Sequence, residues 1–171
     1  MRYLITNRTP LTVIERAVGD GVDYVQVREK AMSSSQLFDY VKNVMSTGAK
    51  VLVNDRLDVA LAAGAAGVHL RSNAAAPARI RSITPNHFLI AVSCHSIAEV
   101  IRAENEGADF VVLGPIFAKP DYAPPLGLEV LRQTREAVNI PVFALGGITQ
   151  ETAPLCGDFA AIGLFQELFG A

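Results

Sequence analysis

The sequence predicts a (β/α)8 barrel, in which eight parallel strands close into a cylinder and helices cover the outside. Three observations support this prediction. Short apolar segments alternate with amphipathic segments along the 171 residues, as they do in folds with a parallel sheet. The alternation recurs about eight times, at intervals of roughly 20 residues. Half of the residues are hydrophobic and only 19% are charged, which is typical of strands buried on both faces.

The strands are predicted from runs of apolar and β-branched residues that end at polar residues or glycine. They cover residues 2–6, 23–27, 51–53, 67–70, 88–92, 109–113, 141–145 and 159–162. The helices are predicted from apolar residues at helical spacing. They cover residues 11–18, 35–46, 57–63, 77–83, 97–106, 128–138 and 164–169. Ser96 and Glu99 form a predicted capping box, and residues 146–149 are expected to open one more short helix that ends near Pro154.

An open, doubly wound sheet is the structural alternative to a barrel. No Gly-x-Gly-x-x-Gly follows the first strand, which argues against a dinucleotide-binding fold. The length predicts a single domain over residues 1–171. Barrels of this class usually have about 200 residues or more. We therefore expect a compact α/β (β/α)8 TIM barrel with short helices, short loops and a shortened C-terminus.

Composition excludes several classes of function. A net charge of −2 argues against nucleic-acid binding, which needs a basic surface. No apolar run reaches the roughly 18–20 residues of a membrane span, and the N-terminus has no signal-peptide pattern. Cys94 and Cys156 lack metal-binding spacing and are expected to be reduced thiols of a cytoplasmic protein. Apolar outer helices and the short C-terminus indicate a possible homo-oligomer, which a monomer in size-exclusion chromatography would contradict.

Two cations follow the second predicted strand. Valine alternates with polar residues over 25–28, which places Gln26, Arg28 and Lys30 at or near the C-terminal end of that strand. In α/β folds this end of the sheet binds ligands. Two cations with an amide nearby indicate an anionic ligand. The alternative is that residues 28–30 form a solvated loop.

The third predicted strand ends at Asn54 and Asp55. Asp55 is the best candidate for a Mg²⁺ ligand, because hard cations prefer carboxylate oxygens together with phosphate oxygens. The alternative is that Asp55 caps the helix at residues 57–63. Arg28 and Lys30 are expected at the same carboxyl end of the barrel, which we call its mouth. Together with Asp55 they predict a pocket for pyrophosphate and Mg²⁺.

Gly146 and Gly147 follow the seventh predicted strand. Two glycines allow the backbone to approach a ligand closely, and the N-terminus of a following helix would favour a phosphate monoester. Barrel enzymes often bind phosphate at this position. The alternative is a simple glycine-rich turn.

Ser93 and His95 follow the fifth predicted strand. His95 is a candidate general acid or base near neutral pH, and its alternative is a helix-entry residue. No Asp lies next to it in sequence, so a serine hydrolase is only weakly indicated. His69 lies within the fourth strand and is expected to be a packed barrel residue.

Seven segments, in order and spanning nearly the whole chain, give the sequence a resemblance to a known family. They read V-Q-V-R-E-K, V-N-D-R-L-D-V-A, G-A-A-G-V-H-L, S-C-H-S, G-A-D-F-V-V-L-G-P-I-F, P-P-L-G-L and I-P-V-F-A-L-G-G-I-T. With them the chain resembles the thiamin phosphate synthase/TenI family. The resemblance implies a (β/α)8 barrel that acts in thiamin biosynthesis.

The family resemblance implies two possible reactions. A synthase joins hydroxymethylpyrimidine diphosphate to thiazole phosphate: Mg²⁺ and basic residues help diphosphate to leave, and the thiazole nitrogen attacks the pyrimidine carbocation. A TenI-type tautomerase aromatises a thiazole carboxylate phosphate by proton transfer through a histidine. We expect the synthase reaction first and the tautomerase second. A family member that binds thiazole or thiamin phosphates without turnover is the third possibility.

The resemblance also implies roles for the residues named above. Gln26, Arg28 and Lys30 match the pyrimidine-diphosphate site of the synthases. Asn54 and Asp55 match an amide and the first Mg²⁺ carboxylate. These five residues together are those that a diphosphate needs, whereas proton transfer alone does not require Asp55.

The remaining matches lie in the second half of the chain. Ser93 matches a serine that contacts substrate. His95 matches a histidine found in both branches of the family, so it does not discriminate between them. Gly146 and Gly147 match the thiazole-phosphate loop.

The chain departs from the synthase pattern at three places. Residues 71–74 replace G-Q-x-D, so that Ala74 stands where a second Mg²⁺ carboxylate is usual. Residues 118–122 replace a T-x-T-K diphosphate loop, and residues 162–164 replace a phosphate-binding serine. Arg71, Lys119 and Asp121 are candidates to compensate for these losses.

Overall fold

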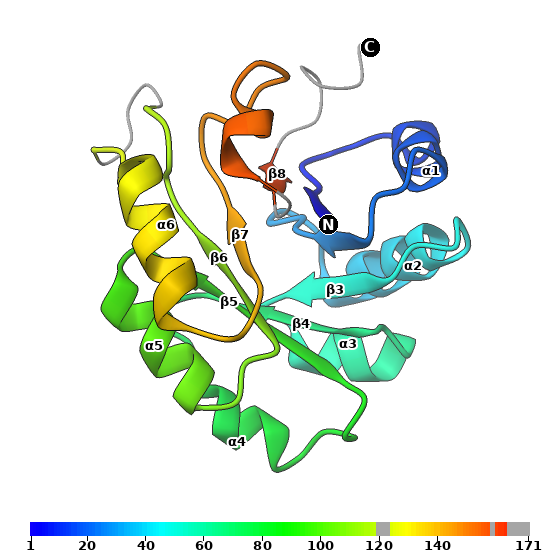
Figure 1. Ribbon diagram of the computed structural model, residues 1–171. Helices are drawn as coiled ribbons and strands as arrows, with labels where there is room; N and C mark the ends of the chain where they lie inside the picture. Colours follow the sequence, from blue (N-terminus) through cyan, green and yellow to red (C-terminus); the bar gives the residue numbers. More distant parts are fainter. Residues whose placement is uncertain (119–123, 158–159, 164–171) are drawn as a thin grey trace.

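The computed structural model describes residues 1–118 and 124–157 in full and the backbone of residues 160–163. Within these residues eight parallel strands form a closed barrel in chain order, with β8 paired to β1 (Figure 1). The barrel prediction is therefore confirmed, and the open-sheet alternative is wrong. The predicted helix at residues 164–169 lies outside the described residues, as do residues 119–123, and the single domain over residues 1–171 stays a prediction.

The strands are short and the helices lie outside them. The strands are β1 (Arg2–Ile5), β2 (Tyr24–Val27), β3 (Val51–Asn54), β4 (Gly67–Leu70), β5 (Leu89–Cys94), β6 (Phe110–Leu113), β7 (Val142–Ala144) and β8 (Ala160–Gly163). The α-helices are α1 (Leu11–Gly19), α2 (Ser34–Met45), α3 (Leu57–Ala63), α4 (Pro77–Arg81), α5 (Ile97–Asn105) and α6 (Gly127–Ala137). These bounds agree with the sequence predictions to within two residues.

The segment after β7 is where the prediction fails. No α-helix opens at residues 146–149; a turn leads instead to a 3₁₀-helix, η1 (Ala153–Cys156). Two threonines bond reciprocally before it: Thr149 N–H donates to Thr152 Oγ1 at 2.7 Å, and Thr152 N–H donates to Thr149 Oγ1 at 3.3 Å. Reciprocal bonds of this kind cap the first turn of a helix, and here only the 3₁₀-helix η1 follows them.

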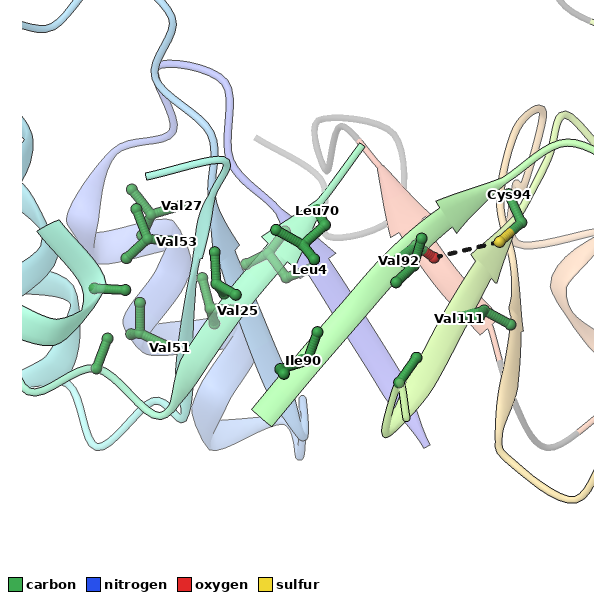
Figure 2. Packing of buried hydrophobic residues seen from close by; sticks show 14 of the residues in the cluster. Leu4, Val25, Val27, Val51, Val53, Leu70, Ile90, Val92, Cys94 and Val111 are labelled. Carbon is green, nitrogen blue, oxygen red and sulfur yellow. Dashed lines mark hydrogen bonds between the residues drawn. The ribbon is translucent and has the colours of Figure 1, made fainter. Parts of the chain in front are cut away.

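The alternation of side chains along each strand produces two separate cores. One lies between the strands and the outer helices; Figure 2 shows part of it, including Val25, Val27, Val51 and Val53. The other fills the barrel and consists of Tyr3, Leu52, Ala91, Phe110, Val112 and Phe143. Each large apolar side chain so buried contributes about 1.5–3 kcal/mol. Among the described residues this inner core fills the middle of the barrel, which leaves the carboxyl ends of the strands for a ligand.

Two observations bear on the environment of the protein. Among the described residues, no helix combines the length and the apolar character that crossing a membrane requires. Cys94 and Cys156 are both buried and both free, as the sequence predicted.

Candidate active site

A cavity of about 1410 Å³ lies at the carboxyl ends of the strands. Loops that follow seven of the strands, β1 to β7, contribute to its lining. All nine predicted site residues line it: Gln26, Arg28, Lys30, Asn54, Asp55, Ser93, His95, Gly146 and Gly147. Because the strands close in chain order, β3 lies opposite β7. The Asp55 side of the mouth therefore faces the Gly146 side.

The loop after β2 is held rigidly by Glu29. This carboxylate is buried and accepts hydrogen bonds from Thr6 Oγ1 at 2.6 Å and from the N–H of Arg8 at 2.9 and 3.0 Å. Thr6 Oγ1 in turn accepts from the N–H of Arg28 at 3.1 Å. Residues 28–30 are thus not a solvated loop as a whole. Sequence reasoning missed Glu29 because its position between two cations suggested an exposed charge.

Arg28 and Lys30 bring positive charge to the cavity. Arg28 is half-buried and Lys30 is exposed, and both line the cavity. Within the described ranges neither side chain pairs with a carboxylate. Their charges are therefore available to an anionic ligand.

Gln26 and Asn54 form an amide pair at the base of the mouth. Gln26 Nε2 donates to Asn54 Oδ1 at 2.9 Å, and Asn54 Nδ2 donates to Asp55 Oδ2 at 3.2 Å. Gln26 is 2% exposed, and its Oε1 has no hydrogen-bond partner among the described residues. A buried acceptor without a partner costs about 1–3 kcal/mol. A ligand that brings a donor, such as an amino group, would remove this cost.

Asp55 pairs with Arg71. The N–H of Arg71 donates to Asp55 Oδ1 at 3.0 Å, and the Arg71 guanidinium forms an ion pair with Oδ2. Asp55 does not cap α3: residue 56 occupies the cap position and makes no side-chain cap bond. The N-cap alternative is therefore wrong. Of the three candidate compensating residues, Arg71 reaches the cavity, and Lys119 and Asp121 lie outside the described residues.

The glycine pair after β7 packs tightly against the loop after β6. Gly146 and Gly147 have φ of 95° and 65°, a region that favours glycine. Phe117 N–H donates to the Gly146 carbonyl at 3.0 Å. A Cβ at Gly146 would lie 2.7 Å from Pro115 Cα, and one at Gly147 would lie 2.7 Å from Phe117 Cβ. Glycine is required at both positions by conformation and by space.

This loop also presents backbone donors to the cavity. The N–H groups of Gly147 and Ile148 donate to no group in the part of the chain that the structure describes. Both residues line the cavity. Phosphate binding here would rest on these two donors rather than on an α-helix dipole.

His95 is paired with the carboxylate of Glu99, a residue that the sequence predicted to form a capping box with Ser96. Glu99 Oε2 accepts from the N–H of His95 at 2.8 Å and lies 3.3 Å from its Nδ1. Ser96 Oγ accepts from the N–H of Glu99 at 3.2 Å, so the predicted capping box forms only in half. The i, i+4 spacing of His95 and Glu99 was the available signal for this dyad.

Ser93 contacts a different histidine. Its Oγ lies 2.8 Å from Nε2 of His69, and Nδ1 of His69 lies 2.8 Å from the Tyr3 hydroxyl. His69 is 1% exposed, which confirms that it is a packed barrel residue. The partner behind His69 is a tyrosine, not a carboxylate, so the contacts of Ser93 are not those of a serine-hydrolase triad.

Burial of His69 predicts a pH-dependent stability. Burial, with a smaller contribution from Arg28, lowers the pKa of His69 to about 3. In the unfolded chain this histidine takes up a proton near its usual pKa of about 6.5. The folded state therefore loses stability as the pH falls, by about 2 kcal/mol between pH 7 and pH 5. Urea unfolding at both pH values measures it.

The control for this prediction is the exposed His87. His87→Gln should keep the loss of stability between pH 7 and pH 5, and His69→Gln should remove most of it. Equal pH dependence in the two variants would contradict the assignment to His69.

The sequence of this chain is similar to those of known proteins of one family. The family model described as thiamine monophosphate synthase (TMP-TENI) matches residues 2–164. A putative thiamine-phosphate synthase 2 of Aquifex aeolicus is 39% identical over 173 residues, which cover 95% of this chain and 92% of that protein. The thiamine-phosphate synthase of Methanoculleus marisnigri is 42% identical over 160 residues, which cover 86% of this chain and 76% of that protein.

A solved structure of a similarly named protein also matches this chain. The thiamine phosphate pyrophosphorylase of Pyrococcus furiosus superposes with a TM-score of 0.85 at 32% identity, covering 95% of this chain and 84% of that protein. A Bacteroides thetaiotaomicron protein with the same name superposes with a TM-score of 0.60 at 20% identity, which bears on the fold alone.

Proposed function

The chain belongs to the thiamine monophosphate synthase family of thiamin-biosynthesis enzymes, and we propose that it joins hydroxymethylpyrimidine diphosphate to thiazole phosphate. In this reaction the bond between the pyrimidine methylene carbon and the diphosphate oxygen breaks. A bond forms between that carbon and the thiazole nitrogen. The products are thiamin phosphate and diphosphate.

One observation carries the proposal: a single cavity holds two groups of anion-binding atoms on opposite sides. Arg28 and Lys30 follow β2, beside the Asp55 loop, and the free N–H groups of Gly147 and Ile148 follow β7. A reaction between two phosphorylated substrates needs two such sites. The unpartnered Oε1 of Gln26 belongs to the same cavity and suits the amino group of a pyrimidine.

The cations act on the leaving group. As the carbon–oxygen bond lengthens, negative charge grows on the diphosphate, and Arg28 and Lys30 offset it. The half-buried position of Arg28 strengthens this effect, because charges interact more strongly away from bulk water. The Glu29 hydrogen bonds keep the loop in place before the substrate binds, so little reorganisation is required.

Mg²⁺ fits this site when it is shared with a substrate. No group of three His, Cys, Asp or Glu side chains able to hold a metal occurs among the described residues. One carboxylate suffices where phosphate oxygens and waters supply the other ligands. We propose that Asp55 is this carboxylate and that it exchanges Arg71 for the metal. When bound, Mg²⁺ would neutralise charge on the diphosphate.

This proposal predicts that metal binding depends on both Asp55 and diphosphate. With inorganic pyrophosphate present, Asp55→Asn should weaken Mn²⁺ binding about tenfold or more, since it removes the charged ligand. Asp20→Asn is the matched control, because Asp20 pairs with Arg16 and neither residue lines the cavity. Electron paramagnetic resonance of free Mn²⁺ measures both. Equal binding in the two variants would exclude Asp55 as the ligand.

The proposed reaction has a direct test. The protein is incubated with hydroxymethylpyrimidine diphosphate, thiazole phosphate and Mg²⁺, and thiamin phosphate is measured. Product formation at a rate that scales with enzyme supports the proposal. Normal binding of thiazole phosphate without any product would overturn it. If phosphate ligands then still raise the melting temperature, the chain binds these compounds without turnover.

A second candidate function rests on His95. Its pairing with Glu99 at the rim of the cavity is the arrangement expected of a proton-transfer residue. We propose the tautomerisation of thiazole carboxylate phosphate as this alternative reaction. The assay uses the non-aromatic isomer as substrate. His95→Ala should abolish this turnover, and the absence of turnover in the unaltered protein would exclude the tautomerase.

The cellular location and the partners of the enzyme are part of the proposal. Two buried free thiols suit a reducing compartment, and we propose a cytoplasmic location. Its partners are the small phosphorylated substrates named above. Assembly into a homo-oligomer stays a prediction, which size-exclusion chromatography tests.

A further inference from the structure

A chain of three side chains runs from the inside of the barrel to the cavity. It begins at Tyr3 on β1, passes through His69 on β4 and ends at Ser93 on β5. Both links are 2.8 Å long. Tyr3 and His69 are 0% and 1% exposed, and their rings stack with centroids 5.7 Å apart. Ser93 is half-buried and lines the cavity.

The direction of these hydrogen bonds follows from counting protons. A neutral imidazole has one donor nitrogen and one acceptor nitrogen. If Nδ1 of His69 carried the proton, it would donate to the Tyr3 oxygen. The Tyr3 proton would then need a second acceptor, and the hydroxyl has none among the described residues. A buried hydroxyl donor without a partner is costly, so Tyr3 donates to Nδ1 and the histidine proton lies on Nε2.

The direction of the hydrogen bond between His69 and Ser93 is therefore also fixed. Its Oγ accepts from Nε2–H of His69, so its own proton is not used in this contact. That proton is free to point into the cavity. A doubly protonated His69 would also donate to Ser93 but would clash with the Tyr3 proton, and burial keeps the ring neutral by lowering its pKa to about 3.

We propose that Tyr3 and His69 are positioning residues that hold Ser93 as a hydrogen-bond donor to an oxyanion of the ligand. Tyr3 selects the Nε2–H tautomer, and His69 prevents Ser93 from turning its proton inward. Given the proposed function, the oxyanion is a diphosphate oxygen, on which charge grows as the bond to carbon breaks. A donor with a fixed direction stabilises that charge without reorganisation.

The first measurement needs no variant and no substrate. The ¹⁵N chemical shifts of His69 in the unaltered protein report which ring nitrogen carries the proton. We expect protonated Nε2 and unprotonated Nδ1 at neutral pH. A proton on Nδ1 would overturn the proposal, whatever reaction the protein catalyses.

The second measurement uses Tyr3→Phe, which keeps the aromatic ring and removes the donor to Nδ1. We expect both His69 tautomers in this variant and a weakening of inorganic pyrophosphate binding by about two- to tenfold. Ser93→Ala should weaken that binding about tenfold or more, because it removes a hydrogen bond to a charged group. Added to Ser93→Ala, Tyr3→Phe should have no further effect.

The matched control is Tyr24→Phe. Tyr24 packs in the same aromatic cluster, with its ring stacked on Phe110, but it is no partner of His69. This variant should keep one tautomer and full pyrophosphate affinity. If Tyr3→Phe behaves like this control in both readouts, the proposal is wrong. Both readouts are independent of product formation, so failure of the synthase reaction remains distinguishable from failure of the tautomer mechanism.

Discussion

Replacing Arg28 with glutamine is expected to reduce the rate of thiamin phosphate formation about 100- to 1000-fold. This is the usual loss when one preorganised group that stabilises transition-state charge is removed. Arg28 is half-buried at the cavity and pairs with no carboxylate among the described residues. Its charge is therefore available to the diphosphate in the proposed reaction. Steady-state kinetics with both substrates measures kcat and kcat/KM.

Arg16→Gln is the matched control for this variant. Arg16 lies on α1, its guanidinium pairs with Asp20, and it does not line the cavity. It should leave the rate unchanged. In the proposed mechanism Arg28 acts on diphosphate departure, so its loss should leave the KM for thiazole phosphate within about twofold. A variant with an unchanged kcat would show that Arg28 does not act on the leaving group.

The second large effect is expected in stability, from Gly146→Ala. An alanine at a φ of 95° costs about 1–2 kcal/mol in backbone conformation. Its Cβ would also lie 2.7 Å from Pro115 Cα, and such overpacking costs about 1–3 kcal/mol more. We expect a loss of about 2–5 kcal/mol in the free energy of unfolding, measured by chemical denaturation, together with weaker phosphate binding.

Gly48→Ala separates the two causes of this loss. Gly48 has a similar φ of 84°, but a Cβ there would meet nothing within 4 Å. Only the conformational cost should remain, about 1–2 kcal/mol. If the two variants lose equal stability, the close packing of Gly146 against Pro115 contributes nothing.

The barrel and the residues of its mouth were predictable because both depend on local pattern. Apolar strands repeat along the chain, and polar residues that follow parallel strands must gather at one edge. Gln26, Arg28, Asn54 and Ser93 lie in one cavity for this reason.

The partners of these residues were not predictable in the same way. The Asp55–Arg71 pair joins two neighbouring strand ends, and the bond between Tyr3 and His69 spans 66 positions of the sequence. The second contact depends on the closed barrel, and neither contact follows from a local pattern. The segment after β7 was predicted only in part: Thr149 and Thr152 form the reciprocal bonds that cap a helix, but the 3₁₀-helix η1 follows in place of an α-helix.

The aromatic packing inside the barrel has a consequence for how substrates enter the site and how products leave it. Tyr3, Phe110 and Phe143 are at most 3% exposed and block any passage through the cylinder. Both substrates must enter, and both products must leave, by the same open end. Whichever molecule occupies the outer half of that opening controls the exit of the one beneath it. An excess of one substrate is therefore expected to inhibit turnover by trapping what the previous cycle left behind.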